Sequence, residues 1–524
     1  MRFQASSKLT LVLAFVFAEL AHAPSAGAVD PTVVEVDSGS VRGVAVNGVI
    51  SFKGLPYAQP PVGDLRWRPP QPVKNWSDVR DATSFGPECM QTDNVPKSED
   101  CLTLNVWKPA GTVGPLPVMV WIYGGALVHG QTSLYPADNL ARQGVVVVSM
   151  NYRMGRLGFF AHPALLNEKP DELHGNYGYM DQLAALQWVQ RNIGAFGGDP
   201  KQVTIFGESA GGGSVLTHLT SPLSRGLFAR AILESPGIPT PRAKVVGYTD
   251  FSTAQRMAVD YAKSLGIDGD NQKARKALRA LSAEKLTEGT DAKIEVGALS
   301  AGKPLIGVAG SMIDEKLVVE TPEAAIAAGR WAKVPIIIGA NDRDLPVGVT
   351  TSKDTLFAQF GSYAEEARKL YDPKGDQPLD ELKQQLFADR TMTEPARHLA
   401  DLIAGSGQTV WLYRFSYVAQ ALRSNPVWKG TPHGLEIPYF FDLPAVIVKD
   451  KVTANDMKMA DAASGYWVGF AKTGDPNGDG RPQWPRYQPG VDKIINFTND
   501  GVVVEPDPIR ARLDLWEKVW SQAK

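Results

Sequence analysis

The chain has only two cysteines, almost no net charge and no long apolar run beyond its N-terminus. Its 54 basic and 56 acidic side chains leave a formal charge of −2, so nothing in the composition favours binding to nucleic acid or to anionic membranes. No later stretch reaches the roughly 20 apolar residues of a membrane-spanning helix. A hydrophobic content of 44% over 524 residues excludes a disordered or collagen-like chain. We expect a globular protein with no membrane span and no nucleic acid partner.

Motifs for common cofactors and metals are also missing. The chain has no phosphate-binding P-loop and no helical histidine pair for zinc. The segment from Asp475 begins like a calcium loop, but Arg486 stands at the twelfth position, where such loops carry a bidentate Glu. The two cysteines have no histidines near them in the sequence and are too few for a metal site. We therefore expect neither a metal nor a cofactor.

The N-terminus has the composition of an export signal. Two basic residues precede an apolar run, Leu9–Ala18, and Ala26-Gly27-Ala28 supplies the small residues of a cleavage site. The run is too short to span a membrane. We predict a signal peptide at residues 1–28, a mature domain at residues 29–524, and a secreted or periplasmic protein.

The two cysteines, Cys89 and Cys101, lie twelve positions apart. In an exported protein, an isolated pair this close predicts a disulfide that closes a short loop. We assign it a structural role.

Apolar runs rich in β-branched residues recur between glycines and prolines. The run Val145–Val148 is continuous rather than alternating, which is typical of strands buried on both faces of a parallel sheet. Helical patterns at Tyr179–Asn192 and Gly212–Leu219 lie between such runs. The alternation predicts an open α/β sheet with helices on both sides. The predicted strands are Leu116–Tyr123, Gly144–Tyr152, Val203–Phe206, Arg230–Leu233, Val334–Gly339 and Val410–Tyr417.

Two polar, helix-prone stretches interrupt this alternation, at about Thr240–Glu320 and at Ser352–Ala400. No Gly/Ser linker, Pro-rich linker or internal repeat divides the chain. We predict one large domain in which these stretches are helical insertions over the carboxyl edge of the sheet.

The most informative short motif is Gly207-Glu208-Ser209-Ala210-Gly211. This G-x-S-x-G sequence follows a predicted strand and precedes a predicted helix. A serine at such a junction sits in a strained turn that exposes its Oγ, and the flanking glycines avoid clashes. The helix N-terminus behind it favours developing negative charge. Ser209 is the candidate nucleophile.

A nucleophilic serine needs a base, and in proteins with this motif the order along the chain is Ser, acid, His. An acid must therefore lie between the serine and the base, which leaves only His398 and His433. His398 lies in a helical pattern, Glu394–Ala404, whereas His433 lies in a loop between Pro and Gly, from which a side chain can reach another element. His433 is the candidate base.

The acid should leave a strand between the serine and the histidine. Asp342 and Asp344 both follow the predicted strand Val334–Gly339, and their spacing does not choose between them. The backbone N–H groups of an oxyanion hole fit the small residues that end another strand, at Trp121–Ala126.

The chain resembles the type-B carboxylesterase and cholinesterase family of the α/β-hydrolase fold over nearly all of its mature length. Phe196–Gly211 fits the family's serine signature, and Glu99–Pro109 fits its second signature. Further family-like blocks are Gly54–Ala58, Leu65–Pro70 and Gly175–Gly178. The resemblance implies a large, mostly parallel central sheet, helices on both faces and helical insertions over the active site. It also implies that Cys89 and Cys101 form the family's first disulfide.

The family's acid maps by position to Asp344, where most members have Glu followed by Gly; here Leu345 follows. The implied oxyanion donors are Gly125, Ala126 and Ala210. Members usually have a third Gly at position 126, so the Ala126 methyl group takes space near the acyl carbon.

These features predict a serine carboxylesterase that acts on a small-molecule ester through an acyl-enzyme. Choline-binding members of the family carry a tryptophan inside the first disulfide loop, whose ring faces a quaternary ammonium group. This chain has no aromatic residue between the cysteines, which argues against a cholinesterase. The alternatives are a lipase, a narrow-specificity detoxifying esterase and a non-catalytic binding module. His129 and Arg343 could favour an acidic substrate if they lie near the site, although a structural role is the more common fate of such side chains.

Overall fold

The computed structural model describes residues 1, 30–112, 114–236, 248–290, 310–344, 352–425, 427–478 and 480–522. The chain divides into two units, Met1–Pro31 and Thr32–Lys524. The signal peptide predicted at residues 1–28 lies outside the described residues except for residue 1, so the boundary at residue 29 stays a prediction. All elements below belong to the larger unit.

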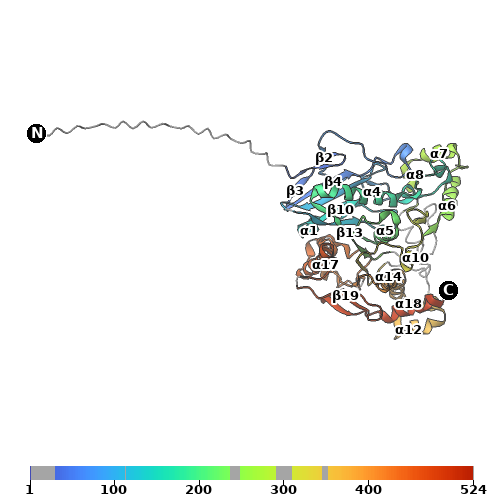
Figure 1. Ribbon diagram of the computed structural model, residues 1–524. Helices are drawn as coiled ribbons and strands as arrows, with labels where there is room; N and C mark the ends of the chain where they lie inside the picture. The colour runs from blue at the N-terminus through green and yellow to red at the C-terminus, as the bar shows by residue number, and fades with distance from the viewer. Residues whose placement is uncertain are drawn as a thin grey trace. The chain divides into compact units, whose positions relative to one another are not determined.

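An eleven-stranded mixed sheet runs through the described part of this unit, in the order β20-β19-β18-β17-β14-β13-β9-β10-β8-β4-β3. Figure 1 shows the blue N-terminal strands toward one edge of this sheet and the red C-terminal strands toward the other. The strands are β3 (Val44–Val46), β4 (Val49–Pro56), β8 (Thr103–Pro109), β9 (Leu116–Ile122), β10 (Val146–Met150), β13 (Gly198–Glu208), β14 (Arg230–Glu234), β17 (Ile336–Asn341), β18 (Val410–Phe415), β19 (Lys493–Thr498) and β20 (Gly501–Pro506).

The centre of the sheet, from β10 to β19, is parallel. The six predicted strands all lie there, with ends that differ by a few residues. Every residue of β10, β17 and β18 is buried, and each strand begins with at least three consecutive apolar residues, which is typical of strands covered on both faces.

The antiparallel strands at the two edges of the sheet were not predicted from the sequence. Strands β3, β4 and β8 pair antiparallel beside β10, and β19 and β20 form a hairpin at the opposite edge. Ser51 and Lys53 interrupt the apolar residues of β4. Strand β20 has three consecutive valines but is only half-buried. Shorter pairings involve β1 (Val33–Val36), β2 (Gly39–Arg42), β5 (Arg80–Asp81), β6 (Glu88–Cys89), β7 (Lys97–Ser98), β11 (Phe159–Phe160), β12 (Gly175–Asn176), β15 (Thr249–Asp250) and β16 (Met312–Ile313).

Helices pack against both faces of the sheet. One group contains α1 and α17, which are joined by the hydrogen bond from Gln143 to Ser464, and another contains α5, α10 and α14 (Figure 1). The principal helices are α1 (Asp138–Arg142), α4 (Tyr177–Asn192), α5 (Ala210–Thr220), α6 (Phe251–Ser264), α7 (Gln272–Arg279), α8 (Ala283–Thr287), α10 (Pro322–Ala327), α11 (Lys353–Ala358), α12 (Ala364–Tyr371), α13 (Leu379–Ala388), α14 (Glu394–Gly405), α17 (Ala454–Thr473) and α18 (Arg510–Gln522). Shorter helices are α2 (Gly155–Gly158), α3 (Pro163–Leu166), α15 (Ile437–Phe440) and α16 (Ala445–Val448).

The described parts of both insertions are mainly helical, apart from the short pair β15 and β16. They contact segments that leave the carboxyl ends of strands. Arg156, beyond β10, donates to the carbonyl of Leu286 in α8 at 3.0 Å. Arg343, beyond β17, donates to Gln384 in α13 at 2.9 Å. The predicted insertion over this edge therefore agrees with the described residues; residues 240–247 and 291–309 lie outside them.

Two features are absent from the residues that the structure describes. No helix in these ranges has the length and apolar character needed to cross a membrane. In the same ranges, no three His, Cys, Asp or Glu side chains are grouped closely enough to hold a metal ion.

Candidate active site

Ser209 lies in the sharp turn between β13 and α5. Its backbone has φ 57° and ψ −124°, a left-handed conformation that costs a non-glycine residue about 1–3 kcal/mol. The turn is held because Ser209 N donates to the carbonyl of Glu234 at 2.9 Å, and Gly213 N donates to Ser209 O at 2.9 Å. The strain lifts the Oγ away from the sheet.

The two glycines of the motif are required by the end of β9. A Cβ on Gly207 would lie 2.5 Å from the carbonyl oxygen of Ile122, and one on Gly211 would lie 2.0 Å from the same oxygen. Neither contact is sterically possible. The glycines therefore allow β9 to approach the turn, which agrees with the interpretation of G-x-S-x-G as a strained strand-to-helix junction.

The structure brings the candidate base and one candidate acid to the serine. His433 Nε2 lies 2.8 Å from Ser209 Oγ, and His433 Nδ1 lies 2.6 Å from Asp344 Oδ1. Asp344 is fully buried, while the His433 side chain is 18% exposed. In a hydrogen-bonded chain of serine, imidazole and carboxylate, the serine hydroxyl can transfer its proton to the imidazole ring.

Asp344 is held by donors on its far side. Its Oδ2 accepts hydrogen bonds from Ser235 Oγ and from the backbone N–H of Asn341, both at 2.8 Å. These contacts leave Oδ1 free to accept from the histidine ring. Ser235 was missed by sequence analysis, because nothing in the sequence places it near Asp344.

Asp342, the other acid left open by spacing, has a different position. Its Oδ1 accepts from the backbone N–H of Thr431 at 2.6 Å. Asp342 therefore holds the loop that carries His433 and makes its hydrogen bond to the loop backbone, not to the imidazole. His398 lies elsewhere, on α14, where it pairs with Glu323 at 3.1 Å.

Three buried glutamates surround this arrangement and were not recognised from the sequence. Glu208 Oε1 lies 3.2 Å from His433 Nε2, Glu234 accepts from Trp467 Nε1 at 2.6 Å, and Glu436 accepts from Asn341 Nδ2. Burial raises the pKa of each to about 8. Sequence alone could not reveal them because their effect comes from burial.

These carboxyl groups act on the candidate base. Burial of His433 lowers the pKa of the imidazole, but the carboxyl groups of Glu208 and Asp344 outweigh it, so the pKa lies above its ordinary value. The protonated ring that would form during proton transfer is thus stabilised in a site that is largely shielded from water.

The segment predicted to carry the oxyanion donors lies against the serine. A Cβ on Gly124 would be 2.5 Å from the carbonyl oxygen of Glu208 and 2.9 Å from Ser209 Cβ. Gly125 and Ala126 follow with φ of 94° and 56°, and Ala210 directly follows Ser209 at the start of α5. Gly125 and Ala126 therefore directly follow a residue that lies against Ser209, and Ala210 is bonded to Ser209 itself.

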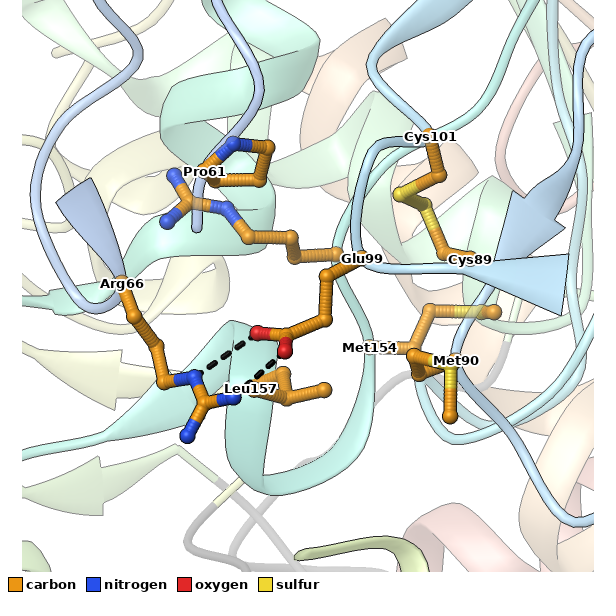
Figure 2. A pocket seen from close by; sticks show the side chains of 9 residues that line it. Pro61, Arg66, Cys89, Met90, Glu99, Cys101, Met154 and Leu157 are labelled. Carbon is orange, nitrogen blue, oxygen red and sulfur yellow. Dashed lines mark hydrogen bonds and ion pairs between the residues drawn. A yellow bond between two sulfur atoms is a disulfide. The ribbon is translucent and has the colours of Figure 1, made fainter. Parts of the chain in front are cut away.

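The predicted disulfide between Cys89 and Cys101 is present. Figure 2 shows it beside a pocket in which Glu99, within the same loop, faces Arg66. Arg66 Nε donates to Glu99 at 2.7 Å, and its Nη1 donates to the carbonyl of Leu281 at 2.6 Å. The disulfide loop is thus fixed to the helical insertion.

The two side chains considered for an acidic substrate have protein partners. Arg343 forms a buried ion pair with Glu381 on α13, so it is not available to a substrate. His129 is 28% exposed and lies 3.7 Å from Asp93 in the disulfide loop.

Comparison with known proteins identifies the class. The carboxylesterase family model matches residues 30–516. Fumonisin B1 esterase of Sphingopyxis macrogoltabida is 37% identical over 487 residues, covering 88% of this chain and 85% of that protein. Para-nitrobenzyl esterase of Bacillus subtilis (strain 168) is 34% identical over 501 residues, covering 91% and 96%.

Solved structures agree with the sequence comparisons. A structure titled PNB esterase matches with a TM-score of 0.78 at 32% identity, covering 93% of this chain and all of that one. The chain therefore belongs to the carboxylesterase family. It has the α/β-hydrolase fold and is a carboxylic ester hydrolase.

The two acids can be separated by amide substitution. In Asp344→Asn the amide oxygen should turn toward the Asn341 N–H, which places the NH₂ group against His433 Nδ1 and forces the unproductive tautomer. We expect kcat to fall on the order of 10³-fold or more. Asp342→Asn can still accept from Thr431 and should lose less than about tenfold. Steady-state kinetics on p-nitrophenyl butyrate measures both, and the reverse ranking would assign the acid to Asp342.

The pH profile tests the influence of Glu208 on His433. A base with a raised pKa is protonated, and so inactive, over a wider acidic range. Above its raised pKa, Glu208 carries a negative charge 3.2 Å from His433 Nε2. Glu208→Gln removes that charge, so the pKa of His433 should fall and the acid limb of kcat/KM should move toward lower pH by about one unit. Glu323→Gln, beside His398, is the matched control and should leave the profile unchanged. An unmoved limb in Glu208→Gln would contradict this coupling.

Proposed function

We propose that this carboxylesterase cleaves its substrate through an acyl-enzyme on Ser209. The observation that carries the proposal is the continuous hydrogen-bond chain from Ser209 Oγ through His433 to Asp344. The strained turn at Ser209 supports it, since strain of this kind persists only where the surrounding structure enforces it.

The reaction follows from the geometry. His433 Nε2 takes the proton of Ser209 as its Oγ attacks the ester carbonyl, while Asp344 orients the ring and stabilises the imidazolium. His433 then passes the proton to the departing alcohol oxygen. A water molecule next attacks the acyl-enzyme with the same base, which releases the acid and restores the serine.

The tetrahedral intermediate carries a negative oxygen that needs donors fixed in advance. The backbone N–H groups of Gly125, Ala126 and Ala210 supply them in this proposal. Burial strengthens these interactions because there is little water to compete for the oxyanion. No step requires a metal or a cofactor.

The family indicates a small-molecule ester as substrate. The names of the relatives make p-nitrobenzyl esters and fumonisin B1 sensible additions to a substrate panel. The disulfide, together with the signal-like composition of residues 1–28, supports a secreted or periplasmic location. A non-catalytic binding module is disfavoured, because it would not need the serine and histidine to be kept at 2.8 Å.

Alanine substitutions test the nucleophile and the base. Ser209→Ala and His433→Ala should each lower kcat on the order of 10⁴-fold or more, because either change removes the proton-transfer pair. The assay measures hydrolysis of p-nitrophenyl acetate, butyrate and octanoate by the mature protein, with thermal unfolding as a control for folding. A folded Ser209→Ala variant that keeps wild-type activity would overturn the proposal.

Two additional measurements separate the alternatives. Labelling of the wild type by a fluorophosphonate, absent in Ser209→Ala, would distinguish a selective esterase from a binding module if the panel gave no turnover. A jump in rate above the solubility limit of the octanoate would instead identify a lipase.

A further inference from the structure

The turn that follows β9 has positive φ at three successive residues, and two of them are not glycine. Gly125, Ala126 and Leu127 have φ of 94°, 56° and 64°. For Ala126 and Leu127 the left-handed conformation costs about 1–2 kcal/mol each. Within the turn, Gly125 O accepts from the N–H groups of Val128 and His129 at 3.0 and 3.1 Å. These local bonds close the turn but do not fix its direction relative to Ser209.

Hydrogen bonds from residues outside the turn fix its position. On one side, Gly155 N donates to the carbonyl of Leu127 at 2.7 Å. On the other side, the side chain of Gln91 pairs with both backbone groups of Gly130: Nε2 donates to Gly130 O at 2.8 Å, and Oε1 accepts from Gly130 N at 3.0 Å. The amide of Gln91 therefore binds Gly130 as a neighbouring strand would.

Gln91 is itself rigidly held. It is 1% exposed, and its Nε2 also donates to the carbonyl of Cys89 at 3.0 Å. The disulfide joins Cys89 to Cys101, so Gln91 lies two residues from a covalent crosslink. Its contacts leave it little freedom to adjust if Gly130 moves.

A second contact from the same segment reinforces the first. The buried carboxylate of Glu88 accepts from the backbone N–H groups of Thr132 and Ser133 at 3.2 and 3.3 Å. Gly130 must also be glycine, because a Cβ there would lie 2.4 Å from the ring of Tyr123. The segment 88–91 thus holds the segment 130–133 by side-chain to backbone hydrogen bonds.

We infer that Gln91 is a positioning residue for the oxyanion hole, holding the strained turn so that the N–H groups of Gly125 and Ala126 point at the reacting carbonyl. The inference rests on the proposed function, since it assigns those N–H groups to the oxyanion. Gln91 does not touch the substrate and acts only through Gly130. The disulfide then has a role in catalysis as well as in stability, because it restrains the segment that carries Gln91.

The substitution Gln91→Met tests this directly. Met has nearly the length of Gln but neither the donor nor the acceptor, so the turn loses its outer restraint. Removal of one oxyanion donor costs about 10²–10³ in kcat, and misalignment of two donors should lower kcat about 10–100-fold. The KM for p-nitrophenyl butyrate should change less than about twofold, because the donors act mainly in the transition state.

Gln190→Met is the matched control. Gln190 Nε2 also bridges two carbonyl oxygens, those of Pro200 at 2.8 Å and Leu227 at 2.9 Å. It makes these bonds from α4 and has no contact with the turn. Both variants should lose similar stability in thermal unfolding, but only Gln91→Met should lose kcat and bind a trifluoromethyl ketone inhibitor more weakly in the same proportion.

Gln91→Glu supplies a readout that a merely structural role would not produce. Its ionised carboxylate can accept from Gly130 N but cannot donate to Gly130 O, whereas the protonated acid can do both. The ratio of the kcat of Gln91→Glu to that of the wild type should therefore rise at least about threefold as the pH falls through the titration of this buried carboxyl group. The ratio for Gln190→Met should stay constant.

The outcomes are distinct from those for the proposed function. If Ser209→Ala is inactive and Gln91→Met keeps its kcat within twofold, the positioning role is wrong while the mechanism stands. If Gln91→Met changes stability but leaves inhibitor binding unaltered, the role is also wrong. If Ser209→Ala remains active, the mechanism itself fails, and the positioning role of Gln91, which rests on it, fails as well.

Discussion

The close approach of β9 to the turn at Ser209 is the constraint on which the site depends. The carbonyl of Ile122 occupies the space that side chains at positions 207 and 211 would need. The same approach carries the chain directly into Gly124, which lies against Ser209 Cβ. One steric fact therefore explains the two glycines, the strained serine and the position of the candidate oxyanion donors.

The remaining parts come from the carboxyl ends of neighbouring parallel strands. The segment after β14 supplies Ser235, the segment after β17 supplies Asp344, and His433 lies in the loop that follows β18. Ligands and catalytic groups gather at this edge in open α/β sheets because parallel strands all end there. The buried glutamates belong to the same edge, where loss of water makes their charge costly and their influence on His433 large.

The sequence predicted the parts of the fold that have local signals. Continuous apolar runs identified the central parallel strands, and the glycine spacing identified Ser209 as the candidate nucleophile. The antiparallel edge strand β4 was missed because Ser51 and Lys53 break its apolar run. The choice between Asp342 and Asp344 stayed open on spacing, since both follow the same strand. Gln91 carried no signal at all, because its contacts join segments that are 39 residues apart.

The family resemblance implies Glu at the position of Asp344, the candidate acid, so this site would have to accommodate a shorter side chain. A carboxylate that lacks one methylene reaches less far, so the histidine must come closer. Three hydrogen bonds hold the loop that carries His433 against the segment after β17. Thr431 N donates to Asp342 at 2.6 Å, and Arg343 N donates to Thr431 O at 3.2 Å. Asn341 Nδ2 donates to Pro432 O at 2.9 Å. Asn341, Asp342 and Arg343 lie beside the acid in sequence. The segment 341–344 therefore both presents the carboxylate and pulls the imidazole to it, so that the pair stays at 2.6 Å with the shorter side chain.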